Sequence, residues 1–122
     1  MTAFGNVSSL ELQRIWEGVH GRIVHGDRLT FGVLELDPGS EVPEHSHDNE
    51  QLGMCLEGSL VFRVGDETRE LGPGDTWCIA GNVPHEVQVG DDGAVVIDVF
   101  NPPRDEWRDA ERVDARQPRW PS

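Results

Sequence analysis

Three histidines and one glutamine in this sequence have the spacing of metal ligands. His45 and His47 are two residues apart, Gln51 follows four residues later, and His85 lies on a distant segment. In a β-strand, residues two apart point to the same face, so His45 and His47 can meet one ion and Gln51 keeps that parity. Three imidazoles and one oxygen suit zinc, nickel, manganese, iron or cobalt rather than calcium or magnesium. We therefore expect one divalent transition metal here.

The amide of Gln51 influences the chemistry expected of that metal. With Gln51 and three neutral imidazoles the ligand set carries no charge, whereas a glutamate would bring one negative charge. The ion then polarises a bound oxygen more strongly and finds less help in reaching a trivalent state. The ligand set therefore favours Lewis-acid chemistry over iron-based oxygen activation.

A second group of residues with chemical potential lies near the end of the chain, where an apolar run carries a carboxylate. Asp98 and Phe100 share one face of this run, and the opposite face is apolar, with Val95, Ile97 and Val99. If Asp98 faces a protein interior, burial raises its pKa and makes it a candidate general acid or base. Arg104 follows two prolines and can grip a carboxylate at two points. The alternative is a structural ion pair between Asp98 and Arg104, with Phe100 in the core.

The elements that must position these groups are short strands between glycine- and proline-containing turns. Strand character is found in residues 29–36, 51–56, 59–64, 76–79, 85–89 and 94–100. Several short strands at close spacing predict a sandwich or barrel, and 122 residues suit one domain. Residues 10–19 form either a strand or one helical turn followed by a strand. His20 and His25 have glycine neighbours, and we expect them in turns, outside the ligand set.

Two glycine-bounded blocks surround the ligand candidates. Gly39 precedes His45 by six residues, Gly58 follows Gln51 by seven, and a second block runs from Gly74 to His85. These blocks resemble the two motifs of the cupin superfamily, in which a small β-barrel holds one metal on three histidines and a glutamate or glutamine. The sequence departs from the usual motifs at a few positions, and none of the changes removes a ligand. These positions are Gln51, where many cupins have glutamate, and Ala80, Asn82 and Val89.

The resemblance implies an all-β, single-domain cupin barrel of the double-stranded β-helix, or jelly-roll, type. Residues 30–107 would form the barrel with its metal site. Residues 1–29 would supply an N-terminal segment and the first strands, which in cupin-like chains often cross to a second subunit, so a homodimer is implied. Residues 108–122 would form a tail that is either a short helix or poorly ordered.

A closer resemblance is to the small bacterial cupins of the KdgF type, which open 4,5-unsaturated uronates to linear keto sugars. It rests on the His-x-His pair, the glutamine, the distal histidine and the Asp-x-Phe-x-x-x-Arg ending. It implies that His45, His47, Gln51 and His85 bind the metal. It also implies catalytic roles for Asp98 and Arg104, and substrate contacts for Phe100 and Arg104. The implied substrate is a small anionic sugar, and the implied compartment is the cytoplasm.

Composition narrows the partners. The formal net charge of −13 disfavours nucleic acid and anionic membranes as partners. The sequence has neither a membrane-spanning apolar run nor the features of a signal peptide at its start, which favours the cytoplasm. Two alternatives to the uronate hypothesis remain: another metal-dependent cupin enzyme, such as a dioxygenase, isomerase or cyclase, and a non-catalytic module that binds a small molecule.

Overall fold

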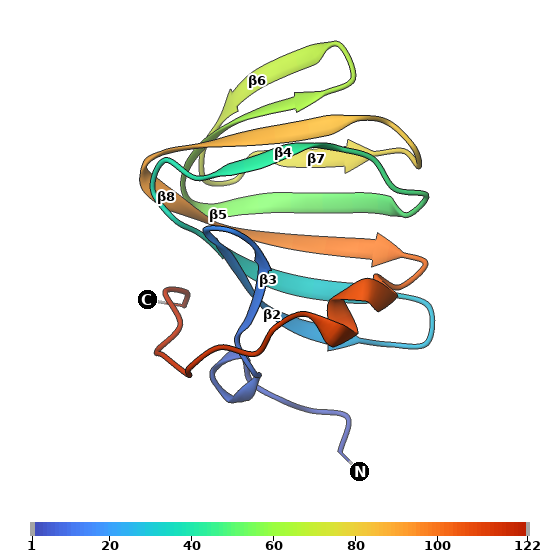
Figure 1. The fold of residues 1–122 in the computed structure, drawn as a ribbon, viewed down its shortest axis with the longest axis vertical. Coiled ribbons are helices and arrows are strands. Elements are labelled where there is room, and N and C mark those ends of the chain that lie inside the picture. Colours follow the sequence, from blue (N-terminus) through green and yellow to red (C-terminus); the bar gives the residue numbers. More distant parts are fainter. Residues whose placement is uncertain (1, 122) are drawn as a thin grey trace.

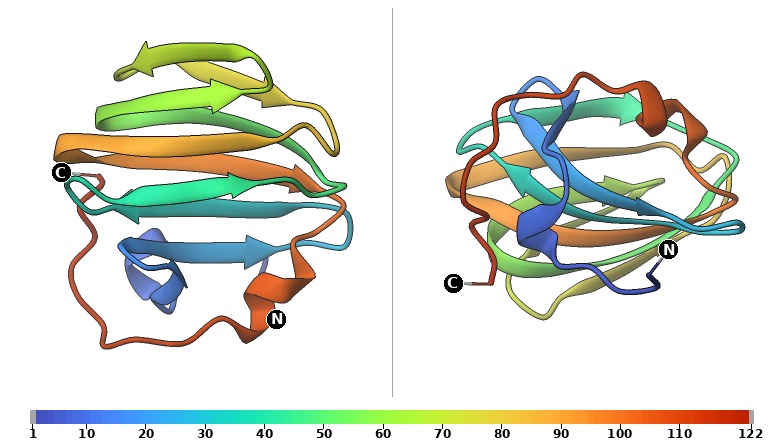
Figure 2. Two further views of the ribbon diagram at one scale, coloured as in Figure 1. Left: turned by 45° about the horizontal axis from the view of Figure 1, so that its top comes forward. Right: turned by 90° about the horizontal axis from the view of Figure 1, so that it is seen from below.

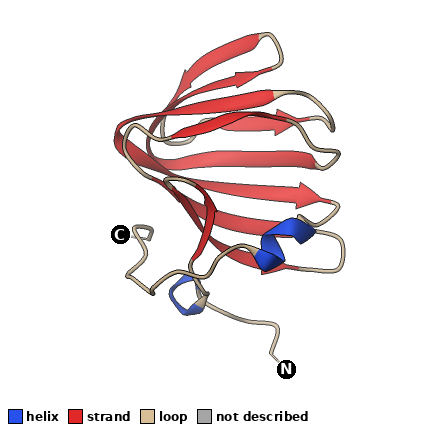
Figure 3. Cartoon of the chain, viewed as in Figure 1, coloured by secondary structure: helices blue, strands red, loops and turns tan. Residues whose placement is uncertain are grey.

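The computed structural model describes residues 2–121, and nearly all of its regular structure is β-strand (Figure 3). The strands are β1 (Gln13–Trp16), β2 (Val19–His25), β3 (Thr30–Leu36), β4 (Glu41–His45), β5 (Glu50–Val64), β6 (Glu67–Leu71), β7 (Thr76–Ile79) and β8 (His85–Asn101). The helical residues form two short 3-10 turns, η1 (Val7–Ser9) and η2 (Asp105–Asp109). None of the described helices is long and apolar enough to cross a membrane.

The strands form a jelly-roll barrel in which β5 and β8 take part in both halves (Figure 1). All strand pairs are antiparallel. In the larger half, the first half of β5 pairs with β7 on one side and with the second half of β8 on the other. The second half of β8 also pairs with β3, β3 pairs with β2, and β2 pairs with β1. The second half of β5 pairs with β6 and with the first half of β8, which also pairs with β4. This confirms the all-β, jelly-roll fold expected from the sequence.

Two further views show how the two halves of the barrel face each other (Figure 2). The core residues fill the space between their inward faces. Inward residues recur at every second position, as in β7, where Trp77 and Ile79 are buried and Cys78 between them is exposed. The same alternation in β8 buries Asp98 and Phe100, so this face does look into the barrel.

Three features of the strands differ from the sequence-based expectation. The runs 51–56 and 59–64 are one strand, and so are 85–89 and 94–100. The turn signals between them mark bulges where the register shifts, not chain reversals. In addition, the predicted runs did not include β2, β4 or β6, and the five residues of β6 are mostly exposed and polar and so lack an apolar alternation.

Within residues 10–19 the structure has the strand form of the prediction: β1 is followed by a two-residue turn and the start of β2, and the 3-10 turn η1 precedes this range. His20 and His25 were wrongly expected in turns, since both lie within β2. The tail after η2 is neither a helix nor loose chain. It runs back along β1, where Arg14 and Val113 donate backbone hydrogen bonds to Glu111 and Leu12.

Candidate functional site

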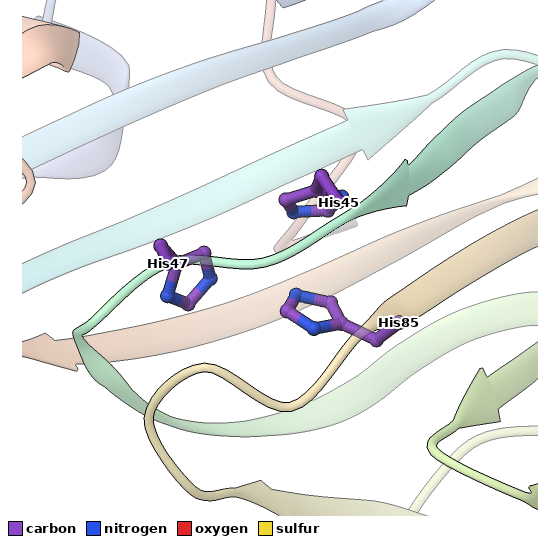
Figure 4. A group of neighbouring side chains, drawn as sticks. All are labelled: His45, His47 and His85. Carbon is purple, nitrogen blue, oxygen red and sulfur yellow. The ribbon is translucent and has the colours of Figure 1, made fainter.

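Three elements bring the histidines together inside the barrel (Figure 4). His45 is the last residue of β4 and is the strand partner of His85, the first residue of β8. His47 lies in the connection after β4, and Gln51 is the second residue of β5. The candidate ligand atoms of the three histidines all lie within 4.8 Å of one another. The residues named from the sequence therefore do converge. The predicted reason was wrong for Gln51, however, because the chain turns between β4 and β5 and Gln51 does not share one strand with His45 and His47.

Each of the three rings is oriented by a hydrogen bond from Nδ1 to a backbone carbonyl. The pairs are His45 with Pro43 at 2.9 Å, His47 with Asn49 at 3.1 Å and His85 with Val83 at 2.8 Å. A carbonyl oxygen only accepts, so Nδ1 carries the proton and a neutral ring keeps its lone pair on Nε2. Within the described chain, Nε2 of His85 is buried and has no hydrogen-bond partner. Such an atom is suited to bind a metal.

Gln51 faces this cluster with its amide oxygen. Its Oε1 lies 3.1 Å from Nε2 of His47, and its Nε2 donates to Oδ1 of Asp98 at 3.0 Å. Burial and the nearby charge of Arg104 lower the pKa of His47, so the ring is neutral near pH 7. Two atoms that both accept therefore face each other, an arrangement that a cation between them stabilises.

The other two histidines are also neutral near pH 7. Burial lowers the pKa of His85 to about 4, and it also lowers the pKa of His45. Neutral imidazoles are the form that binds metals. The three histidines could thus hold a metal ion, with the Gln51 oxygen beside them.

Asp98 lies next to this group and is only 4% exposed. Burial raises its pKa to about 6, although hydrogen bonds from Gln51 and Trp77 and the charge of Arg104 favour the ionised form. The Trp77 indole donates to Oδ1 at 2.8 Å. The alternative expectation was an ion pair between Asp98 and Arg104. This pair is not formed among the described residues, where Arg104 makes its salt bridge with Glu106 instead.

Arg104 is held between two aromatic rings. Its guanidinium carbon lies 5.0 Å from the ring centroid of Phe100 and 4.7 Å from that of Trp107. Its Nε donates to Glu106 at 3.0 Å, and its backbone N–H donates to the Thr30 hydroxyl at 2.9 Å. The described residues provide no partner for the two terminal nitrogens, which remain available to a ligand.

A cavity of about 50 Å³ connects these groups. The polar residues that line it are His45, Gln51, His85, Asp98 and Arg104. The rest of the wall is apolar: aliphatic side chains and five aromatic ones, namely Trp16, Phe62, Trp77, Phe100 and Trp107. The sequence argument did not assign the three tryptophans to the site. For Trp77 a signal existed, because it alternates with Ile79 in a predicted strand. Trp16 and Trp107 come from segments whose path could not be inferred.

Comparison with known proteins agrees with this geometry. A family model described as a cupin domain matches residues 32–100, more than half of the chain. The chain belongs to the cupin family. This confirms the resemblance inferred from the two glycine-bounded blocks.

Among other cupins, the chain is similar to the pectin degradation protein KdgF of Dickeya dadantii, with 28% identity over 94 residues, 75% of this chain and 86% of that protein. It is 33% identical to the L-ectoine synthase of Bordetella parapertussis over 94 residues, 74% of this chain and 72% of that protein. The solved structure of KdgF from Halomonas sp. superposes with a TM-score of 0.80 at 25% identity, covering 87% of this chain and 98% of that one. The likeness thus includes enzymes.

Proposed function

We propose that this cupin opens 4,5-unsaturated uronates to linear keto sugars, with a divalent metal bound by His45, His47, His85 and Gln51. The observation that carries the proposal is that one cavity is lined by His45, His85 and Gln51 together with the buried carboxylate of Asp98 and by Arg104, and that His47 lies beside the other two histidines. Among residues 2–121 nothing binds the terminal nitrogens of Arg104. The similarity to two KdgF proteins supports the same reaction.

The reaction needs proton transfer but no redox change. In an unsaturated uronate, carbon 5 carries both the carboxylate and the ring oxygen, and carbon 1 is a hemiacetal. Opening breaks the bond between carbon 1 and the ring oxygen, while the hemiacetal hydroxyl loses its proton to give an aldehyde. The ring oxygen keeps the electron pair of the broken bond, and the resulting enolate takes up one proton at carbon 4 and becomes a ketone, so atoms, protons and electrons balance. Asp98 would transfer these protons, since it is the buried carboxylate that borders the cavity.

Arg104 would bind the substrate carboxylate with its two terminal nitrogens. This local charge offsets the acidic surface of a chain whose formal net charge is −13. Phe100 would pack against the sugar and exclude water while it supports the guanidinium from one side. The cavity of about 50 Å³ is smaller than a sugar ring, so the substrate would extend beyond it.

A divalent metal, when bound, supplies Lewis-acid polarisation of a substrate oxygen. The chain's own contribution is to fix the ligands. The backbone acceptors of Nδ1 orient the three imidazoles, and Asp98 orients the Gln51 amide so that its oxygen faces them.

The test is the loss of the absorbance of the conjugated double bond when metal-loaded protein meets lyase-generated unsaturated uronates. We expect protein-dependent decay that chelator abolishes and added metal restores. His47→Ala removes one imidazole, so we expect it to lose both bound metal and activity. No acceleration with any of the five candidate metals would reject the reaction.

L-Ectoine formation is a second candidate, favoured by the 33% identity to an L-ectoine synthase. The same protein preparations can be assayed for ectoine by chromatography. Ectoine produced without decay of the uronate signal would place the chain with that relative instead.

We also infer that two copies of the chain associate through the outer face of the larger half of the barrel. Five residues that are strand partners form a row across β2, β3, β8, β5 and β7 on this face. The row consists of Val24, Phe31, Val99, Leu52 and Cys78. None of the five residues is charged, and Val99 lies at the centre of the row. The row can therefore pack against the same row of a second copy that is related by a two-fold axis.

A further inference from the structure

Asp98 receives two hydrogen bonds on the same oxygen. Gln51 Nε2 donates to Oδ1 at 3.0 Å and Trp77 Nε1 donates to Oδ1 at 2.8 Å. Among residues 2–121 no group donates to Oδ2. Two donors fix the carboxylate plane and leave its second oxygen unoccupied beside the cavity.

The sheet is built to allow this meeting. Gly53 on β5 is the strand partner of Trp77 on one side and of Asp98 on the other. Side chains of directly opposed residues share a face, so Trp77 and Asp98 lean toward each other over Gly53. A Cβ at Gly53 would overlap both Trp77 Nε1 and Asp98 Oδ1. The glycine therefore makes room for the hydrogen bond.

Gln51 serves the metal ligands and Asp98 at once. Its amide oxygen faces His47 at 3.1 Å, while its amide nitrogen donates to Asp98. An ionised glutamate could supply only acceptors. Its second oxygen would then lie about where the donor nitrogen now lies, 3.0 Å from Asp98 Oδ1, and the two acceptors would repel.

We propose that Gln51 and Trp77 are positioning residues, whose hydrogen bonds hold the Asp98 carboxylate in one orientation. Position 51 then requires an amide, because the amide oxygen faces the metal ligands while the amide N–H donates to Asp98. The inference rests on the proposed function for the role of Asp98. The hydrogen-bond network itself can be tested without substrate.

The first test is a substrate-free NMR measurement on protein labelled with ¹⁵N at its four tryptophans. Trp77→Phe assigns the Trp77 indole signal by its loss. We expect Gln51→Glu to move this signal, because the carboxylate that accepts from the indole changes orientation, while the signals of the other three tryptophans stay in place. An unmoved Trp77 signal in Gln51→Glu would overturn the proposal.

The second test separates positioning from binding. Trp77→Phe keeps a ring against Phe62, whose centroid is 5.1 Å away, but removes the N–H. Losing one hydrogen bond to a carboxylate predicts a fall in kcat of about 10- to 100-fold, with KM changed less than about two-fold and metal content unchanged. Trp120→Phe, in the tail and away from the cavity, is the matched control and should match wild type. Unchanged kcat in Trp77→Phe would also overturn the proposal.

Gln51→Glu completes the set, because it differs from wild type in one atom type. We expect it to retain metal, measured by elemental analysis, and to lose activity at least as much as Trp77→Phe. Full activity with bound metal would refute the need for an amide. If wild-type protein opens no uronate, the proposed function fails on its own, and the NMR measurement still decides whether Gln51 and Trp77 hold Asp98.

Discussion

At the scale of single residues, the site is organised by hydrogen bonds that leave chosen atoms free. The Nδ1 atoms of three histidines are bound to carbonyls, so Nε2 is available, and Oδ1 of Asp98 is bound twice, so Oδ2 is available. Arg104 follows the same principle, since Nε donates to Glu106 and nothing within residues 2–121 binds the two terminal nitrogens. Each reactive group is thus oriented by neighbours that do not occupy its reactive atom.

Asp98→Asn is the direct test of proton transfer. Asparagine can still accept from Gln51 and Trp77 through its oxygen, so the site keeps its shape, but it cannot take up or release a proton. We expect kcat for uronate opening to fall by about 10²- to 10⁴-fold while metal content stays at the wild-type level. The exposed Asp66→Asn serves as control and should be fully active. Near-normal turnover of Asp98→Asn would remove Asp98 from the mechanism.

The sequence was sufficient to name the metal-facing residues but not their contacts. The His-x-His pair, Gln51 and His85 could be selected because few residue types bind metals and their spacing is unusual. The partners of Asp98 could not be predicted. Gln51, Trp77 and Asp98 belong to three different strands, and only the register that places Gly53 between Trp77 and Asp98 brings them together.

At the scale of elements, β5 and β8 explain why strands were predicted well and their boundaries less well. Gly58 has a φ of +81°, and a Cβ there would overlap the Gly93 carbonyl, so the turn signals at 58 and 90–93 are real. The glycines at these positions face each other across the β5–β8 pair, however, and form a bulge through which both strands continue. Apolar alternation reports the local conformation, whereas the choice between a turn and a bulge depends on the partner strand.

The C-terminal tail is tied to β2 and β3 by a buried ionic cluster. Arg22 and Glu35 are 2% and 1% exposed, and Glu35 also accepts from Arg116 and from the backbone N–H of Arg119, both at 3.0 Å. This cluster explains why the tail, expected to be a helix or loose, is extended and fixed. The sequence contains no local signal for it, because the partners are about 80 residues apart.

Glu35→Gln should destabilise the protein strongly. It leaves Arg22 buried without a counter-charge, which costs about 3 kcal/mol of unfolding free energy in urea denaturation near pH 7. Glu67→Gln makes the same change in an exposed ion pair and should cost less than about 1 kcal/mol. Equal effects of the two substitutions would show that the buried cluster does not contribute in this way.

The same carboxylate gives stability a defined pH dependence. Burial alone would raise the pKa of Glu35, but the Arg119 amide and the guanidinium groups of Arg22 and Arg116 outweigh it and hold the pKa below 4.5. A lowered folded-state pKa means that the contribution is complete above about pH 4.5 and is lost as the pH falls through the folded value. The difference in unfolding free energy between wild type and Glu35→Gln should therefore shrink below pH 4.5.

At the scale of the whole molecule, charge and apolar surface act in opposite directions on self-association. Each copy carries a formal net charge of −13, so two copies repel one another, more strongly at low salt. The outer row of the larger half offers the compensating attraction, with Val24 and Leu52 46% and 48% exposed. Stable dimers bury about 800 Å² per partner, so the row would form the centre of a wider contact.

Leu52→Asp is expected to convert the proposed dimer into a monomer. Leu52 lies next to the centre of the row, and near the two-fold axis each added carboxylate would meet the apolar row and the other added charge. Light scattering after size exclusion, at micromolar protein and moderate salt, should give twice the chain mass for wild type and the chain mass for Leu52→Asp. Val61→Asp is the matched control, because Val61 is an exposed apolar residue of the same strand, 41% exposed, but lies in the other half of the barrel. Its protein should remain dimeric, with dimerisation weakening as salt is lowered. A monomeric wild type, or a Leu52→Asp variant as dimeric as wild type, would exclude this face as the interface.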